Sequence, residues 1–480
     1  MVSLVIEHLP LEVLEVLVTF LSAKDLTNCI GVSVTWYRLF SDDLFWKRHC
    51  ISSNHYFSKT KCLVEPVFQL TDNAVLPIEE NRLRFLQEQH VFNNWRCGRF
   101  RKEIIEYELD GSNSMYPNDL EFLDNDHIYE DMHTLHKNRT YEARVWNVAE
   151  TPVLVLTIPY CLCESWPAKV YKIVNSNVIV VIQCNVVQVY KICLDSKNWV
   201  LNHVFFFDKP EEFSRSLTAD SNVKSIFDST RDRSNRYECV VCGHYFIGAC
   251  INSESPLLHI WDIKTGEKVK EDRYEIGHIE SITFICNERV STDKVLVNYK
   301  LKHEEWTSII YDTSLLQFIL PSRFVRNGHV LYFGGHLSVI GGKPIKIVHH
   351  SDATNQKKNM TELSKSLDFD YVDSSTVLPL GSNLLISTEK EIYLVNPVNL
   401  ETRTLIRTHL CWVDVLANRF ILLHDIHDIS LKEVWEIGKT ECKKVLEFSW
   451  NCETVYSASN SVCSKVVLEN FNRIIVLHFW

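Results

Sequence analysis

Few residues of this 480-residue chain have the types and the spacing that chemistry would need. Cys239 and Cys242 have the C-x-x-C spacing of metal ligands or of a redox pair, but no second C-x-x-C pair accompanies them. The surrounding residues predict a β-strand, on which side chains three positions apart point to opposite faces. We therefore interpret the two cysteines as structural thiols.

Two other short segments combine histidine with carboxylate groups, the ligand types of a divalent ion. They are His349-His350 with Asp352, and the cluster of His424, Asp425, His427 and Asp428. The first has no further ligand spaced to complete a site, and the second could bind an ion only weakly. The chain also lacks the P-loop, the G-x-S-x-G elbow and the H-E-x-x-H helix. We therefore expect no metal, no cofactor and no catalytic residue, although missing motifs do not exclude every enzyme.

Three arginines lie together in the polar stretch from Asp208 to Arg236. Arg231, Arg233 and Arg236 could hold a phosphorylated target through charge-assisted hydrogen bonds. A solvated loop is the simpler explanation, and we favour it. They are weak candidates for a substrate-binding site.

Composition narrows the classes of partner and compartment. The net charge of −11 is mild for this length and argues against nucleic-acid or anionic-membrane partners. Apolar residues make up 46%, but no run of eighteen predicts a membrane-spanning helix. The first residues, Met1 to Glu7, show neither a basic region nor a cleavage site, so we expect no secretory signal. The sixteen cysteines are then expected to be free thiols in the cytoplasm or the nucleus.

The elements that would carry a function begin with residues 9–50, which predict three or four short helices. Pro10 suits a first helical turn, Ser22 with Asp25 forms a capping pair, and Ser33 and Asp42 can begin further helices. Apolar residues surround most of the first helix. A unit this small can bury only part of that surface, so the remainder must lie against the rest of the chain or another protein.

The order of residues in this segment resembles an F-box, a helical module that binds an adaptor protein. The resemblance is carried by Leu9-Pro10-Leu11-Glu12-Val13-Leu14, Asp25-Leu26, Val32 with Trp36, and Leu44-Phe45-Trp46. It implies that the segment binds a Skp adaptor through apolar side chains. We expect these to be Leu9, Pro10, Val13, Leu14, Leu17, Phe20, Leu21 and Trp36.

The pattern changes twice after the helices. A charged stretch from Pro77 has helical spacing, and Asn93-Asn94-Trp95-Arg96-Cys97-Gly98 resembles the junction at which F-box and WD-repeat proteins enter a propeller. From about residue 100, short β-branched and aromatic runs alternate with polar turns, which is typical of strands.

The strand-rich part repeats itself. Residues 257–267 match the end of a WD repeat, with Trp261-Asp262 followed by a Lys264-Thr265-Gly266 turn, and seven other segments copy this shape less faithfully. Their marker residues are Trp146, Tyr190, Trp261, Tyr311, Ile347, Leu394, Trp435 and Leu477. Most spacings are close to the period of about 40 to 45 residues that indicates propeller blades. The wider gap before Trp261 predicts an insertion.

We therefore predict a multidomain α plus all-β protein. Residues 4–50 form an F-box, residues 51–92 a helical linker, and residues 93–480 a WD-repeat-like β-propeller of seven or eight degenerate blades. The resemblance implies the non-catalytic substrate-recognition subunit of a Skp–cullin–F-box ubiquitin ligase. Its partners would be the Skp adaptor, through it the cullin and RING subunits, and a protein target. Two alternatives remain: a scaffold that docks the adaptor without ubiquitylation, and a propeller with an axial catalytic site.

Overall fold

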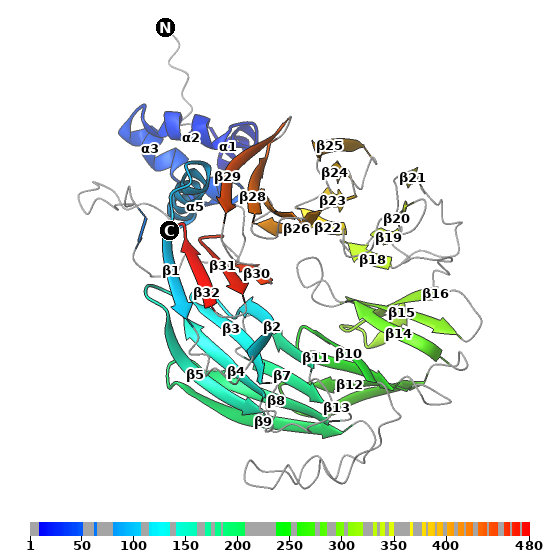
Figure 1. Cartoon of the computed structure of the whole chain (residues 1–480). Helices are drawn as coiled ribbons and strands as arrows, with labels where there is room; N and C mark the ends of the chain where they lie inside the picture. The colour runs from blue at the N-terminus through cyan, green and yellow to red at the C-terminus, as the bar shows by residue number, and fades with distance from the viewer. Residues whose placement is uncertain are drawn as a thin grey trace.

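The computed structural model describes most of the helical and strand-forming parts of the chain. The described residues are 9–50, 62–64, 80–106, 115–134, 141–160, 169–173, 178–183, 186–206, 237–250, 257–273, 279–285, 294–301, 306–319, 330–333, 337–340, 345–349, 365–367, 377–380, 383–388, 391–396, 401–407, 411–416, 419–425, 431–438, 441–449, 456–460, 463–470 and 473–480. Helices form the N-terminal part and strands the remainder (Figure 1).

Four short helices form a small N-terminal module, as the sequence predicted. They are α1 (Leu11–Val18), α2 (Ala23–Ile30), α3 (Val34–Phe40) and α4 (Asp43–Lys47). Ser22 and Asp25 form a reciprocal capping box at the start of α2. The Ser33 hydroxyl accepts a hydrogen bond from the Trp36 amide, and the Asp42 carboxylate accepts one from the Leu44 amide. These caps satisfy amides that have no partner within the helix, which is why each helix begins there.

The core of the helical module contains one side of α1. Leu14 and Val18 of that helix pack with Leu26, Ile30, Phe40, Phe45 and Trp46. The indole of Trp46 is fully buried and donates a hydrogen bond to the Phe40 carbonyl at 2.8 Å.

The strands of the described part form eight four-stranded antiparallel sheets. The first three in chain order are β2 (Met115–Phe122), β3 (His127–Thr134), β4 (Tyr141–Asn147) and β5 (Val153–Tyr160); β6 (Lys169–Ile173), β7 (Val178–Gln183), β8 (Val186–Cys193) and β9 (Asn198–Phe206); and β10 (Tyr237–Cys242), β11 (Tyr245–Cys250), β12 (Leu257–Asp262) and β13 (Lys268–Arg273). The next two are β14 (Ile279–Ile285), β15 (Lys294–Leu301), β16 (Trp306–Asp312) and β17 (Gln317–Ile319); and β18 (Val330–Phe333), β19 (Leu337–Ile340), β20 (Ile345–His349) and β21 (Lys365–Leu367). Then come β22 (Val377–Leu380), β23 (Asn383–Ser387), β24 (Glu391–Val395) and β25 (Thr402–Arg407); and β26 (Cys411–Leu416), β27 (Phe420–Asp425), β28 (Leu431–Ile437) and β29 (Cys442–Ser449).

The eighth sheet, which we call the closing sheet, joins the two ends of the strand-rich region. It combines β30 (Tyr456–Ser459), β31 (Lys465–Asn470) and β32 (Arg473–His478) with β1 (Arg101–Glu106). β1 pairs antiparallel with β32, from Arg101 opposite His478 to Glu106 opposite Arg473. The closing sheet lies between the β26–β29 sheet and the β2–β5 sheet (Figure 1). Apolar clusters join it to both. The sheets are therefore the blades of an eight-bladed β-propeller.

The blade count follows the sequence repeat. Each of the eight marker residues, from Trp146 on β4 to Leu477 on β32, lies on the third strand of its sheet. The prediction of seven or eight blades is thus confirmed at eight within the described residues. The insertion expected in the wide gap, in the polar stretch from Asp208 to Arg236, lies outside the described residues and stays a prediction.

A fifth helix, α5 (Glu80–Arg96), precedes β1. The boundary expected between linker and propeller, at residues 92 and 93, falls inside this continuous helix and is corrected accordingly. The physical reason is that Phe92 and Trp95, on either side of that boundary, pack into the same apolar cluster of the propeller. No helix among the described residues is long and apolar enough to cross a membrane.

Candidate protein-docking site and its link to the propeller

The first helix presents apolar side chains to the surface. Val13, Val16, Leu17 and Phe20 are exposed by 42%, 59%, 45% and 82% respectively. Val13, Val16 and Leu17 are spaced by three and four residues on one side of the helix. Phe20 follows just after the end of the helix, and we call the four residues the α1 stripe. Leu14 and Val18 face the opposite way, into the module core.

The α1 stripe has the properties of a contact surface. Burying a side chain of this kind contributes roughly 1.5–3 kcal/mol, so leaving four of them in water within two helical turns forgoes a sizeable stabilisation. Single exposed apolar residues are ordinary, whereas a contiguous group marks a protein or membrane contact. The α1 stripe is thus an exposed apolar surface that another molecule could cover, as the sequence of this helix suggested.

The structure distributes the expected adaptor contacts between surface and core. Val13, Leu17 and Phe20 belong to the α1 stripe, and Pro10 is exposed at the start of the helix. Leu9, Leu21 and Trp36 are partly buried against the module core.

Leu14 is a correction to those expectations. It is only 3% exposed and packs inside the module, so it holds α1 in place and does not offer a contact surface. Val16 of the stripe and three exposed residues elsewhere in the module were not among the expected adaptor contacts. These are Val32, Val34 and Leu44, of which the two valines flank the helix-capping Ser33.

α5 is fixed to the helical module at its N-terminal end. The Asp43 carboxylate accepts a hydrogen bond from the Asn81 amide, and a second one from the Asn81 side chain. The ring of Phe85 packs on Trp46 with centroids 5.2 Å apart. The Arg82 guanidinium lies 5.8 Å from the Trp46 ring, close enough for a cation–π contact.

The opposite end of α5 is fixed to the propeller by the residues of the N-W-R segment. The Asn94 side chain donates a hydrogen bond to the Phe479 carbonyl at 2.8 Å. The Trp95 indole donates one to the Cys463 carbonyl at 2.9 Å, and its ring also packs near Phe420, 5.8 Å away between centroids. Asn94 and Trp95 are buried, so each of these bonds replaces water at a polar atom that would otherwise be left unsatisfied.

Arg96 completes this anchor with an ion pair. Its guanidinium donates to both carboxylate oxygens of Glu436, with distances between 2.7 and 3.1 Å, and Arg419 donates to the same carboxylate at 2.8 Å. Burial opposes ionisation of Glu436, but the hydrogen bonds and charges of Arg96 and Arg419 outweigh it and lower its pKa. The helical module, α5 and the closing sheet thus follow one another as a single packed unit (Figure 1).

The cysteines considered as metal or redox residues lie apart from each other in the structure. Cys239 packs in the apolar cluster toward the β6–β9 sheet, whereas Cys242 packs in the cluster toward the β14–β17 sheet. They lie on opposite faces of β10, as the strand geometry predicted, and both are free thiols. No group of three potential metal ligands occurs among the residues that the structure describes.

The histidine clusters and the arginines give no composite site in the described part of the chain. His424 pairs through Nε2 with the Asp414 carboxylate at 2.9 Å. Several of the remaining candidates lie outside the described residues: His350, Asp352, His427, Asp428, Arg231, Arg233 and Arg236. For the arginines, the substrate-binding hypothesis stays a prediction.

Part of the chain matches a known family model. Residues 6–52, which include α1 to α4, match the F-box-like family model. No curated protein matches the chain. The chain is similar to the solved structure of Sqt1 from Saccharomyces cerevisiae, with 9% identity over 78% of this chain and 97% of that one and a TM-score of 0.48. It is also similar to the Dos1 propeller, with 10% identity over 79% and 96% and a TM-score of 0.48. A chain in the crystal structure of the mitotic checkpoint complex shows 10% identity over 79% and 93%, with a TM-score of 0.40. The chain therefore joins an F-box-like domain, a protein-interaction module, to a WD-like β-propeller.

Proposed function

We propose that this protein is the substrate-recognition subunit of a Skp–cullin–F-box ubiquitin ligase. The observation that carries the proposal is the α1 stripe, a contiguous apolar surface on the F-box-like domain. The stripe binds the Skp adaptor, through which the chain reaches the cullin and the RING subunit.

In this proposal the protein does no bond chemistry itself and acts in the cytoplasm or the nucleus. The propeller holds a protein target, and the F-box-like domain holds the machine that modifies it. Holding both together raises the effective concentration of the target's lysines at the ubiquitin-loaded enzyme.

The contacts of α5 support this division of roles. One end of the helix is packed on the F-box-like domain through Asn81 and Phe85, and the other end on the propeller through Trp95 and Arg96. A helix held at both ends sets a fixed separation between the adaptor-binding surface and the propeller. Such a separation favours lysines at one position of the target.

The proposal is tested by affinity purification of the full chain from cells, with and without a proteasome inhibitor. The variant is Leu17→Asp/Phe20→Asp in the α1 stripe, and the matched control is Val153→Asp/Leu154→Asp, two exposed apolar residues on β5. The wild type and the control should retain adaptor and cullin, and the stripe variant should lose both. Proteins that accumulate on the wild-type chain only under inhibition are the candidate targets.

Two results would contradict the proposal. Adaptor without cullin on the wild-type chain would favour the scaffold alternative. Cullin retained by the stripe variant would mean that the F-box-like domain is not the point of attachment.

A further inference from the structure

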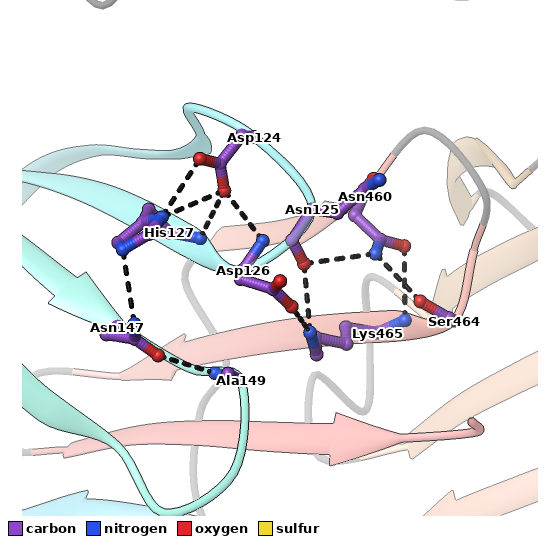
Figure 2. A network of polar contacts seen from close by, with 9 residues as sticks. All are labelled: Asp124, Asn125, Asp126, His127, Asn147, Ala149, Asn460, Ser464 and Lys465. Atoms are coloured by element: carbon purple, nitrogen blue, oxygen red, sulfur yellow. Dashed lines mark hydrogen bonds and ion pairs between the residues drawn. The ribbon is translucent and has the colours of Figure 1, made fainter. Parts of the chain in front are cut away.

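The seam between the closing sheet and the β2–β5 sheet has an apolar interior and a polar end. Ile474 and Val476 of β32 pack in the interior against Phe122 and Ile128. At the polar end, the turn between β2 and β3 meets the start of β31 (Figure 2). The last and first blades of the ring meet here, so this seam closes the propeller.

A buried lysine joins the two blades at the polar end. Lys465 is 4% exposed, and its ammonium group donates to the Asn125 carbonyl at 3.0 Å and pairs with the Asp126 carboxylate. Asn460 reinforces the contact, because its side chain donates to the Asn125 carbonyl at 3.3 Å and accepts from the Lys465 amide at 3.1 Å (Figure 2). Each bond except the last crosses from one blade to the other.

His478 lies beside this lysine on the neighbouring strand. It is opposite Lys465 on one side and opposite Arg101 on the other, and paired residues of adjacent strands share one face of a sheet. Its side chain is 1% exposed, and neither ring nitrogen has a hydrogen-bond partner among the described residues. A neutral imidazole therefore occupies a buried position between two cations.

Two further pairs of charged or titratable groups lie near this seam. Arg101 pairs with Glu103 at 2.6 Å on β1, and Asp124 pairs with the ring of His127 at 2.9 Å in the β2–β3 turn. Asp126, paired with Lys465, is the acidic group that favours a charged His478. Burial, together with the charges of Lys465 and Arg101, outweighs Asp126 and lowers the pKa of His478 to about 4.

We propose that this seam is an acid-sensitive joint of the propeller, which opens when His478 takes up a proton. The protonated ring would be a third cation beside Lys465 and Arg101 in a position that excludes water. In an opened seam the ring reaches water and regains the pKa of an ordinary histidine, near 6.5. Opening therefore binds a proton between pH 6.5 and about 4, so the seam is held most firmly above pH 6.5 and weakens as the pH falls through this window.

Hydrogen–deuterium exchange of the full chain tests the proposal, with rates corrected for the intrinsic effect of pH. Between pH 7 and pH 4.5 the opening constant of the seam should rise on the order of 50-fold, as the two pKa values require. Peptides that contain the β2–β3 turn and β31 should therefore lose protection against exchange as the pH falls. Peptides of the seam between the β6–β9 and β10–β13 sheets should lose much less.

The variant His478→Phe removes the titrating group and keeps a ring of similar size, so most of the acid-induced loss should disappear. His203→Phe, in the other seam, is the matched control and should leave the loss at the joint unchanged. The proposal is overturned if His478→Phe retains the full loss. If that variant does not fold, the wild-type comparison decides alone, because equal loss of protection in both seams also overturns the proposal.

Discussion

Trp95 of α5 stacks on Phe479, which follows the last strand of the chain, with ring centroids 3.5 Å apart and planes inclined by 12°. The two residues are far apart in the sequence, and their contact joins the helix that carries the F-box-like domain to the sheet that closes the propeller. The docking module is therefore attached to the closing sheet through this aromatic stack.

Replacing Trp95 should destabilise the propeller, because this one residue supplies both a ring stack and a hydrogen bond to it. Trp95→Ala removes the stack on Phe479 and leaves the Cys463 carbonyl without its donor, which should cost about 3–5 kcal/mol of unfolding free energy. Trp95→Phe keeps an aromatic ring and should lose about 1–3 kcal/mol through the missing hydrogen bond. Urea unfolding followed by circular dichroism measures both. Equal stability of the alanine variant and the wild type would show that the contact does not hold the helix.

Truncation should reveal α5 as part of the propeller. A fragment of residues 80–480 should be compact and resistant to protease, because it keeps Val91, Phe92 and Trp95 in their cluster. A fragment of residues 97–480 should be cleaved at the closing sheet, where that cluster loses its cover. Limited proteolysis and gel filtration compare the two. If both fragments are equally resistant, the packing of α5 contributes little, and the linker can be separated from the propeller as the sequence suggested.

Trp261 should be a stability residue and the insertion arginines should not. Trp261 is buried and stacks on Phe205 of the preceding blade, with centroids 5.6 Å apart and planes inclined by 18°. Trp261→Ala should therefore cost roughly 3–5 kcal/mol.

The double variant Arg231→Ala/Arg233→Ala, in the polar insertion, should change stability by no more than about 0.5 kcal/mol. Thermal melts and target pull-downs on the same samples separate two roles for the arginines. If they hold a phosphorylated target, capture is lost while the melting temperature stays. A large fall in melting temperature would instead make the insertion structural.

Local sequence signals predicted local structure well in this chain. The caps at Ser22, Ser33 and Asp42 lie where each helix begins, because a side-chain oxygen and a free amide a few residues on are enough to specify them. The blade markers are also correct down to the degenerate segment at Ile347. The β-branched run Ile345-Lys346-Ile347-Val348 still indicates a strand although the Trp-Asp pair is missing there.

Contacts between distant segments could not be predicted in the same way. The sequence of α5 appears as a charged linker, yet Arg84, Glu88 and Asn94 are buried in the folded chain. The sequence could not show that the Leu14 side chain points into the module core. α1 is apolar on nearly every side, so its pattern does not distinguish the inward face. β1 has the sequence Arg-Lys-Glu-Ile-Ile-Glu and becomes part of a blade only through its pairing with β32.

The affinity of the purified full chain for a purified Skp adaptor should depend on the α1 stripe. Leu17→Ala/Phe20→Ala truncates two residues of the α1 stripe, and each apolar anchor of an interface typically contributes about 1–3 kcal/mol. The double variant should therefore bind at least about 30-fold more weakly, since 1.4 kcal/mol corresponds to a factor of ten. Val153→Ala/Leu154→Ala, on the propeller, should bind as the wild type does. Unchanged affinity in the stripe variant, with its helices confirmed by circular dichroism, would mean that the adaptor does not bind through the α1 stripe.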